Sequence, residues 1–415
     1  GAAPQLADHL AHHTAALEGL LVGAGGAIGS AALALPALVK EARYFEEAME
    51  ASRRLVQEGK FEIDAATLEA SIDPDAAGEA RSALADAAIS ALLPHVTAEY
   101  AARHGSVKGG QLAVVALGKL GGREMLPGSD LDLILVYEHA KDADGSEGKA
   151  KRGAPVIRPL PSIQYFTRLA HQMVGAITAP GAEGKLYEVD MRLRPSGSKG
   201  PVAVSLPAFQ RYQAEDAWSW ERMALTRARV VAGPPSLTRR ISAAIRAALT
   251  QPEKAKNAMA DAVAMRARML RELPSDGPWD VKLSPGGLVE VEFIAQALQL
   301  HHAPRHPEVL ATTTRIAITN LAKMGALDSA EAEGLIAAER LWRGISGILR
   351  LTLGPWREDM LPEPAASAVL RAAGPLCPQP PVDLPALRTQ MEKSAALVRK
   401  VFEARLGRLD QGDRK

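Results

Sequence analysis

Two short apolar runs lie between two long stretches of helical character, and this arrangement most constrains the fold. Residues 112–117 (Leu-Ala-Val-Val-Ala-Leu) and 131–137 (Leu-Asp-Leu-Ile-Leu-Val-Tyr) are bounded by glycines and turn residues, which is typical of buried strands. A third short strand is predicted at 186–191. The flanking regions repeat apolar residues at helical spacing. The sequence therefore predicts an α+β fold, with a small mixed sheet flanked by helical N-terminal and C-terminal domains.

The same pattern divides the chain into three expected domains. Residues 1–105 form a helical linker or regulatory domain, in which residues 73–75 (Asp-Pro-Asp) mark a helix start because Asp caps exposed N–H groups. Residues 106–235 contain the predicted strands, and residues 236–415 form a C-terminal helical bundle. Individual helices are expected at 163–177, 257–272 and 287–301.

Composition and charge exclude several classes of protein. Of 415 residues, 49 are Lys or Arg and 48 are Asp or Glu, which gives a net charge of +1 and no global field to attract a nucleic acid. No apolar run reaches the roughly 18–20 residues of a membrane span. Cys377 is the single cysteine, so no internal disulfide forms and a reducing cytoplasm is the expected location. The N-terminus shows no secretion signal. It begins with Gly1 and not with Met, so we expect a piece of a longer protein.

Two acidic residues at the second predicted strand indicate a metal site. Side chains on a strand alternate between faces, so Asp130 and Asp132 share one face while the leucines beside them take the other. Two carboxylates on one face of an apolar strand repel each other and lose hydration. A divalent cation removes both penalties, and Mg²⁺ prefers one or two carboxylates plus substrate phosphates.

A third acid and two arginines occur in and after the third predicted strand. Asp190 is followed by Arg192 and Arg194 at alternate positions, so a continuing strand would present all three on one face. A carboxylate for a metal beside guanidinium groups for phosphate oxygens is the combination that phosphoryl transfer requires. Asp190 is distant from Asp130 in sequence, so its convergence on the first pair is inferred from the expected fold. Each arginine is expected either to neutralise phosphate or to form a structural ion pair.

Residues 118–122 (Gly-Lys-Leu-Gly-Gly) connect the first two predicted strands. Glycines there can bring backbone N–H groups close to a phosphate at the start of a short helix. The segment is not a P-loop, because Lys119 is not followed by Ser or Thr. We expect Gly121 and Gly122 to bind a nucleotide phosphate, and Lys119 either to neutralise it or to form a structural ion pair.

Residues 128–132 (Gly-Ser-Asp-Leu-Asp), after the glycine-rich turn, resemble the DNA polymerase β-like nucleotidyltransferase superfamily. More closely, several segments resemble the glutamine synthetase adenylyltransferase family, also called glutamate–ammonia-ligase adenylyltransferase. These are residues 118–124, 187–197 (Tyr-Glu-Val-Asp-Met-Arg-Leu-Arg-Pro-Ser-Gly), 218–221 (Trp-Ser-Trp-Glu) and 282–293. The resemblance implies a polymerase β-like catalytic core.

The family resemblance also implies an activity. It implies a magnesium-dependent enzyme that transfers AMP from ATP to a tyrosine of glutamine synthetase, releases pyrophosphate and so down-regulates nitrogen assimilation. Members of the family carry two catalytic halves, one attaching AMP and one removing it with inorganic phosphate, and this chain holds one copy of the motifs. The motifs look like the attaching, C-terminal half. The removing half and a non-catalytic regulatory scaffold remain alternatives. A PII signalling protein and glutamine are the implied regulators.

By the same resemblance, individual residues acquire roles. Asp130 and Asp132 are expected to bind the ions that bridge the ATP phosphates, and Asp190 to complete the site nearest the attacking oxygen. Gly128 and Ser129 are expected to contact the triphosphate.

Two further groups in these motifs have a structural expectation. Trp218, Trp220 and Glu221 are expected in the core and scaffold. Glu290 stands where the family usually has Asp. Because Glu290 and Glu292 are two apart on a predicted helix, they cannot share a face well, and at most one faces the site.

Overall fold

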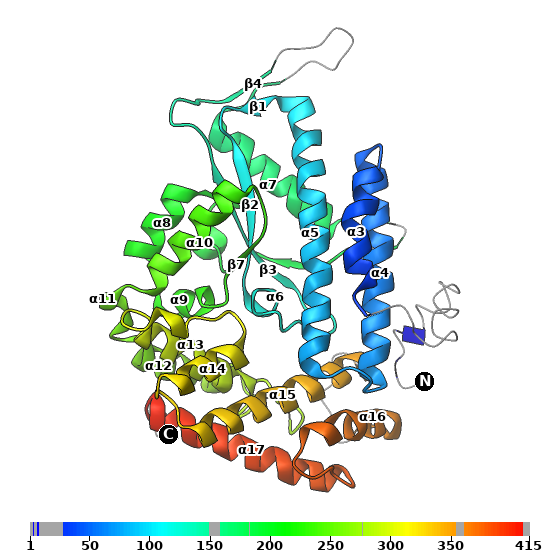
Figure 1. The fold of residues 1–415 in the computed structure, drawn as a ribbon, viewed down its shortest axis with the longest axis vertical. Helices are drawn as coiled ribbons and strands as arrows, with labels where there is room; N and C mark the ends of the chain where they lie inside the picture. Colours follow the sequence, from blue (N-terminus) through cyan, green and yellow to red (C-terminus); the bar gives the residue numbers. More distant parts are fainter. Residues whose placement is uncertain are drawn as a thin grey trace.

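A small mixed sheet lies between helical N-terminal and C-terminal regions (Figure 1). The computed structural model describes residues 28–148, 158–181, 183–275, 277–353 and 361–409, together with Ala3, Leu6 and Ala7. The predicted α+β class is confirmed. Within the described residues, no helix is both long enough and apolar enough to cross a bilayer.

Three helices precede the sheet: α3 (Ser30–Glu41), α4 (Phe45–Leu68) and α5 (Pro74–His104). Helix α5 begins where the sequence predicted, because the Asp73 carboxylate accepts hydrogen bonds from the backbone N–H groups of Asp75 and Ala76, both at 2.9 Å. Pro74 occupies the first helical turn, where no N–H is needed. Helices α3, α4 and α5 pack together, and α5 also contacts the sheet and α7 (Ser162–Thr178).

The sheet is built around one antiparallel pair. Its strands are β2 (Gln111–Ala116), β3 (Leu131–Glu138), β5 (Val189–Asp190), β6 (Ala203–Ser205) and β7 (Arg229–Ala232). Strand β2 pairs antiparallel with β3 and with β7, whereas β5 and β6 both pair parallel with the outer edge of β3. Strands β1 (Ser106–Val107) and β4 (Ser146–Glu147) form a separate antiparallel ribbon.

The two central strands agree with the sequence prediction, and the third does not fully. The runs predicted at 112–117 and 131–137 correspond to β2 and β3, each within one residue at its ends. The strand predicted over 186–191 is shorter and contains two residues, Val189 and Asp190. Strands β6 and β7 were not predicted, since segments of three and four residues carry too little periodicity to detect.

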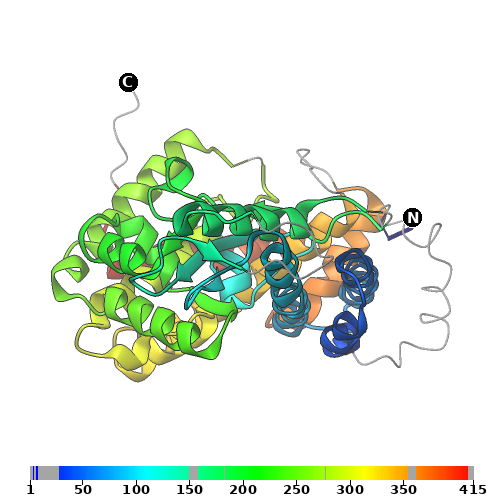
Figure 2. The same cartoon turned by 90° about the horizontal axis from the view of Figure 1, so that it is seen from above.

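Each face of the sheet contributes to a different hydrophobic core. Leu112 and Val114 of β2 pack with the N-terminal helices and α7, whereas Ala113 and Val115 pack with the later helices. This division follows from the two-residue period of a strand. The N-terminal helices therefore lie on one side of the sheet and α8 and α10 on the other (Figures 1 and 2). The later helices are α8 (Leu206–Glu215), α9 (Ser219–Leu225), α10 (Pro235–Leu249) and α11 (Pro252–Ala255).

A helical bundle completes the chain. It contains α12 (Ala258–Glu272), α13 (Leu288–His302), α14 (Thr314–Lys323), α15 (Ser329–Thr352), α16 (Glu363–Ala373) and α17 (Leu384–Arg405). The helices predicted at 257–272 and 287–301 are thus confirmed as α12 and α13. Helix α15 crosses the bundle and also contacts α4 and α5.

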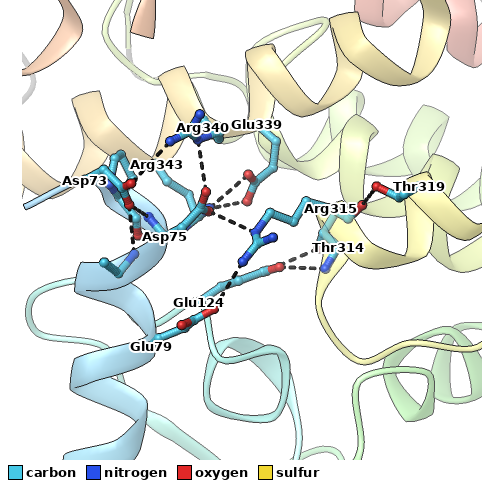
Figure 3. A network of polar contacts seen from close by, with 12 residues as sticks. Asp73, Asp75, Glu79, Glu124, Thr314, Arg315, Thr319, Glu339, Arg340 and Arg343 are labelled. Atoms are coloured by element: carbon cyan, nitrogen blue, oxygen red, sulfur yellow. Dashed lines mark hydrogen bonds and ion pairs between the residues drawn. The ribbon is translucent and has the colours of Figure 1, made fainter. Parts of the chain in front are cut away.

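A network of charged side chains joins the bundle to the N-terminal helices (Figure 3). Its centre is Asp75 at the start of α5, whose side chain is 16% exposed and meets three arginines of the bundle. Arg343 donates to Asp75 and to Glu339, Arg340 Nε lies 3.0 Å from Asp75 Oδ2, and Arg315 Nε lies 3.5 Å from Oδ1. One carboxylate thus links guanidinium groups from two helices of the bundle to the start of α5.

Replacing Asp75 by Ala is expected to lower the free energy of unfolding by about 2 kcal/mol, because it removes one of the two carboxylates that the buried Arg343 guanidinium contacts. Urea denaturation measures this change. The control is Asp142→Ala: its pair with Lys108 is exposed on both sides, so the expected change stays within about 0.5 kcal/mol. Equal unfolding midpoints for the two variants would show that the network does not stabilise the fold.

Candidate active site

The site is built where β5 pairs with β3. The register of these parallel strands places Asp132 directly beside Asp190, and Leu131 beside Val189. The Leu131 N–H donates to the Glu188 carbonyl at 2.9 Å, which fixes this register at the start of β3. Side chains paired in register project from the same face of a sheet. Two acids from segments 58 positions apart in sequence (190 − 132) therefore become neighbours, as the sequence analysis expected.

The charge of this acidic pair is not fully compensated by the protein. Burial and the neighbouring carboxylate of Asp190 raise the pKa of Asp132 to about 6. Asp130 adds to this repulsion, whereas Lys119 and Arg227 partly offset it. The carboxylate of Asp132 therefore lies in a place that favours a nearby cation.

Asp190 has an arginine partner of its own. Arg192 donates to the Asp190 carboxylate through its backbone N–H at 2.8 Å and through Nε at 2.8 Å and Nη2 at 2.5 Å. These bonds hold the pKa of Asp190 below its usual value. The Arg192 side chain is 82% exposed. Its guanidinium group can therefore leave Asp190 and bind another anion without losing much buried surface.

The expectation that Arg192 and Arg194 alternate along a strand is wrong. Strand β5 ends at Asp190, and the chain then turns because Arg194 donates to the carbonyls of Met191 at 2.7 Å, Ser198 at 3.1 Å and Gly200 at 3.1 Å. Arg194 thus organises the turn after β5, with its guanidinium bonded to backbone oxygens.

The glycine-rich segment forms the short helix α6 (Gly118–Gly122) after β2. Gly118 has a φ of +54°, and a Cβ atom there would lie 1.9 Å from Asp132 Oδ2. No other residue type allows the carboxylate of Asp132 to approach this turn so closely. Gly118 was predicted only as part of the glycine-rich segment, yet it lies directly against Asp132 of the acidic pair.

Gly121 and Gly122 have a different environment from the one expected. Both are buried, and a Cβ atom would lie 2.1 Å from the Arg227 carbonyl at Gly121 and 2.2 Å from Arg227 Nη2 at Gly122. Their lack of side chains makes room for Arg227. The contacts thus explain both glycines through packing against an arginine, and the predicted phosphate contact stays a prediction.

Arg227 is a buried cation that the sequence analysis missed. It donates to Glu124 and, through Nη1 at 2.9 Å, to Glu292 of α13. Glu124 in turn accepts from the Thr314 N–H at 2.6 Å and from its hydroxyl at 3.1 Å. The sequence did carry a signal for it, namely an arginine next to a short apolar strand. An arginine buried in such a place requires carboxylate partners.

Lys119 lies close to this buried pair. Burial lowers the pKa of Lys119, and Glu292 opposes that shift. Burial also opposes ionisation of Glu292, but Arg227 and Lys119 outweigh it and lower the pKa of Glu292. Glu292 is thus a neighbouring charge of Lys119, and both predicted roles of Lys119, as a phosphate neutraliser and as a member of a structural ion pair, stay predictions.

The two glutamates of α13 point to different surroundings, as expected. Glu290 is fully buried and accepts from Arg266 at 2.8 Å and from Arg399 at 2.6 Å within the bundle. Glu292 faces Arg227 beside the sheet. The carboxylate at position 290 therefore stabilises the bundle and does not face the acidic pair.

The loop before β3 carries the remaining predicted site residues. Asp130 and Gly128 are exposed, and the Ser129 hydroxyl accepts from the Leu126 N–H at 3.0 Å. Arg350 of α15 donates to the Pro127 carbonyl at 3.0 Å, so the C-terminal helical bundle contacts and stabilises this loop. Arg350 is a second contact of the site that was not predicted.

The tryptophans expected in the core are exposed, and this expectation is wrong. Trp218 is 70% exposed and Trp220 is 40% exposed. Glu221 is buried as expected, because it accepts from the Trp218 N–H at 2.9 Å and from the Tyr212 hydroxyl at 2.8 Å. Glu221 thus satisfies the start of α9 while both indole rings turn outward.

The chemistry of the acidic pair fits a magnesium ion. Among the described residues, no three His, Cys, Asp or Glu side chains are already arranged to hold a metal, and the Asp190 carboxylate is bonded to Arg192. Mg²⁺ needs only one or two protein carboxylates when phosphates supply further oxygens. Asp132 beside Asp190, with the raised pKa of Asp132, meets that requirement.

Replacing Asp132 by Asn is expected to stabilise the metal-free protein. The folded-state pKa of about 6 exceeds the unfolded value of 3.8, so the carboxylate costs stability above pH 6, and the cost disappears as the pH falls towards 4. After allowance for partial solvent screening, the free energy of unfolding of Asp132→Asn at pH 8 should exceed that of the wild type by about 1–2 kcal/mol. Thermal unfolding in EDTA at pH 8 and pH 4 measures it.

The control for this prediction is Asp190→Asn. Arg192 lowers the pKa of Asp190, so Asp190→Asn loses a favourable ion pair while it relieves Asp132, and it should stabilise the protein less than Asp132→Asn does. Identical melting temperatures for the wild type and Asp132→Asn at pH 8 would contradict the proposed repulsion.

Comparison with known proteins places this chain in a family. Residues 1–244 match the Glutamate-ammonia ligase adenylyltransferase family, and the chain belongs to that family. Residues 257–406, which form α12 to α17, match the GlnD PII-uridylyltransferase family.

Curated relatives agree with this assignment. The chain is 41% identical over 374 residues to the bifunctional glutamine synthetase adenylyltransferase/adenylyl-removing enzyme of Mesorhizobium japonicum. That alignment covers 89% of this chain and 36% of the relative. Proteins of the same name from Rhodopseudomonas palustris and Brucella suis are 38% and 39% identical, and each alignment covers 98% of this chain and 40% of the relative. The chain thus spans between 36% and 40% of the length of these relatives.

Proposed function

We propose that this chain is the adenylylating half of a glutamine synthetase adenylyltransferase, with a polymerase β-like core formed by β2, β3, β5 and β7. It transfers AMP from ATP to a tyrosine of glutamine synthetase. The tyrosine oxygen forms a bond to the α-phosphorus, the bond from that phosphorus to the bridging oxygen breaks, and pyrophosphate leaves with the electron pair. The phenolic proton passes to solvent.

The register of β3 and β5 carries the proposal. It brings Asp132 and Asp190 together beside Gly118 in a site where carboxylate repulsion favours a cation. Bound Mg²⁺ would neutralise charge on the phosphates and on the departing pyrophosphate. A structural role alone does not account for two adjacent acids, because their repulsion destabilises the fold.

The other predicted residues receive roles consistent with their positions. Asp130 is exposed at the start of β3 and is available to the ions that bridge the ATP phosphates. Gly128 and Ser129 precede it and contact the triphosphate. Arg192 is the most exposed cation of the site and exchanges Asp190 for phosphate oxygens when ATP binds.

The remaining parts of the chain receive supporting roles in this proposal. Residues 106–235 are the catalytic domain, residues 1–105 a helical linker or regulatory domain, and residues 236–415 a helical bundle. Family membership supports a PII signalling protein and glutamine as regulators. The match of residues 257–406 to a PII-uridylyltransferase family is a further reason to test regulation through the bundle.

Replacing Asp130 by Asn is expected to reduce AMP transfer by about 100-fold or more, because loss of a metal-binding carboxylate removes several kcal/mol of charge stabilisation. The melting temperature should stay near that of the wild type, since Asp130 is exposed. The measurement uses glutamine synthetase, Mg²⁺ and labelled ATP. The control is Asp142→Asn, an exposed acid paired with Lys108, which should transfer AMP normally. Full activity of Asp130→Asn would remove Asp130 from the mechanism.

The reaction products distinguish the two directions. Pyrophosphate release from ATP with unmodified synthetase supports the attaching reaction. Phosphate-dependent release of ADP from AMP-modified synthetase would show the removing reaction. If calorimetry detects no Mg²⁺-dependent binding of ATP, the chain is a non-catalytic scaffold.

A further inference from the structure

Strand β7 begins with an arginine that lies beside the glycine-rich helix of the site. Arg229 is the first residue of β7, and the register of the sheet places it opposite Ala116 at the end of β2. Helix α6 follows β2 after a single residue, so the Arg229 side chain starts next to this helix. The reaction proposed above does not use this cation.

The guanidinium group of Arg229 binds the C-terminal end of α6. Arg229 Nε donates to the Gly121 carbonyl at 3.1 Å, and Nη2 donates to the Leu120 carbonyl at 2.9 Å. The last carbonyls of a helix have no regular partner within it and attract cations. Arg229 binds two of them at once, so it fixes both the position and the direction of the helix end.

An acid of α5 holds the Arg229 guanidinium in place. Asp86 Oδ1 accepts from Nη2 at 2.8 Å, and Asp86 Oδ2 lies 2.7 Å from Nη1. The side chains of Arg229 and Asp86 are 15% and 20% exposed, so the pair is largely shielded from water. A pair with two parallel contacts fixes the plane of a guanidinium group as well as its position. Arg229 therefore links α6 to the N-terminal helices.

A second arginine of the same segment contacts α6 from the bundle. Arg227 lies two positions before Arg229, packs against Gly122 and pairs with Glu292 of α13. Helix α6 is thus contacted by one guanidinium that pairs with the bundle and by another that pairs with α5. A shift of α6 would break contacts to at least one of these two anchored groups.

The other end of α6 contacts the acidic site. Gly118 begins the helix and lies within one helical turn of the carbonyls that Arg229 binds. The Asp132 carboxylate fills the space that a Cβ atom of Gly118 would take, and the Leu117 N–H donates to the Asp132 carbonyl at 2.9 Å. Because the helix has only five residues, a displacement of its C-terminal end also moves Gly118 relative to Asp132.

We propose that Arg229 is a positioning residue for AMP transfer: anchored on Asp86, it holds the end of α6 and so keeps Gly118 against the Asp132 carboxylate. The proposal rests on the adenylylating function given above. Within the described residues Arg229 bonds to α5 and α6 and not to the acidic pair. It acts by keeping Asp132 in one orientation, since a displacement of about 1 Å in a reacting site costs up to about 100-fold in rate.

The first test measures the hold on α6 without metal or nucleotide. Arg229→Met removes the guanidinium group and keeps an unbranched side chain. The amides of Gly121, Arg123 and Glu124 donate to carbonyls within this turn, so their exchange with deuterated solvent should become about tenfold faster in the variant. Mass spectrometry of a peptide that covers residues 117–124 measures the rate.

AMP transfer to glutamine synthetase gives the second readout, at a temperature well below the melting temperature of every variant. Arg229→Met should lower kcat about tenfold or more and leave the KM for glutamine synthetase unchanged. Arg229→Lys keeps the charge but donates from a single atom, so it should recover part of the losses in kcat and in protection from exchange.

A variant of the anchor tests the same contact from α5. Asp86→Asn should change kcat and exchange in the same direction as Arg229→Met, but less. It should add little to Arg229→Met in the double variant, because both substitutions break one contact. If Arg229→Met does not fold, the exchange rate and kcat of Asp86→Asn decide in its place.

The matched control is Arg53→Met. Arg53 is also buried and bonds to one carboxylate, Glu50 at 2.6 Å, and to one backbone carbonyl, that of Ala179 at 3.1 Å. These contacts link α4 to the end of α7. The control should therefore lower the melting temperature but leave kcat and the exchange of residues 117–124 unchanged.

Three results would overturn the proposal. Unchanged exchange in Arg229→Met would show that Arg229 does not hold the turn, and faster exchange with a normal kcat would show that the position of the turn does not matter. An equal loss of kcat in Arg53→Met would reduce the effect to general instability. Absence of AMP transfer by the wild-type chain would instead contradict the proposed function, and the exchange rates would still decide whether Arg229 holds α6.

Discussion

The rest of the site depends on two carboxylates held side by side by the register of β3 and β5. Backbone pairing sets this arrangement, since Leu131 bonds to Glu188 and the side chains of Asp132 and Asp190 follow. The repulsion between the acids explains the neighbouring features. A residue without a side chain at position 118 lets the Asp132 carboxylate reach the turn. The exposed Arg192 side chain pairs with Asp190, whereas Asp132 keeps a raised pKa. The fold thus maintains a charge imbalance that a metal and phosphates can use.

The sheet separates two cores, and the acidic pair lies where they meet. One face packs against the N-terminal helices and the other against the later helices, so both regions reach the loop before β3. Thr314 of the bundle bonds to Glu124 at the start of that loop, and Arg350 bonds to Pro127 within it. The N-terminal side contributes α4, which lines a cavity that ends at Asp130. The position of the exposed acid therefore depends on helices from both ends of the chain.

The sequence allowed prediction of those parts that depend on local pattern. The apolar runs gave β2 and β3, and the residues at 73–75 gave the start of α5, because strand burial and helix capping act over a few residues. The convergence of Asp190 on Asp132 followed from resemblance to a family. Arg227 escaped prediction because its partners, Glu124 and Glu292, lie about 100 and 65 positions away. Trp218 and Trp220 were wrongly placed, because hydrophobicity alone does not show which side of a short helix faces the solvent.

The long-range contacts of the sheet also bear on how the chain can be dissected. Arg229 of β7 donates to Asp86 of α5 at 2.8 Å and to the Leu120 carbonyl at 2.9 Å, while Glu124 depends on Thr314 from the bundle. An excised fragment of residues 106–235 would lose the first and the last of these partners together and expose both hydrophobic faces of the sheet. The region around the sheet is therefore not an independent module, and its smallest autonomous folding unit extends into both flanking helical regions.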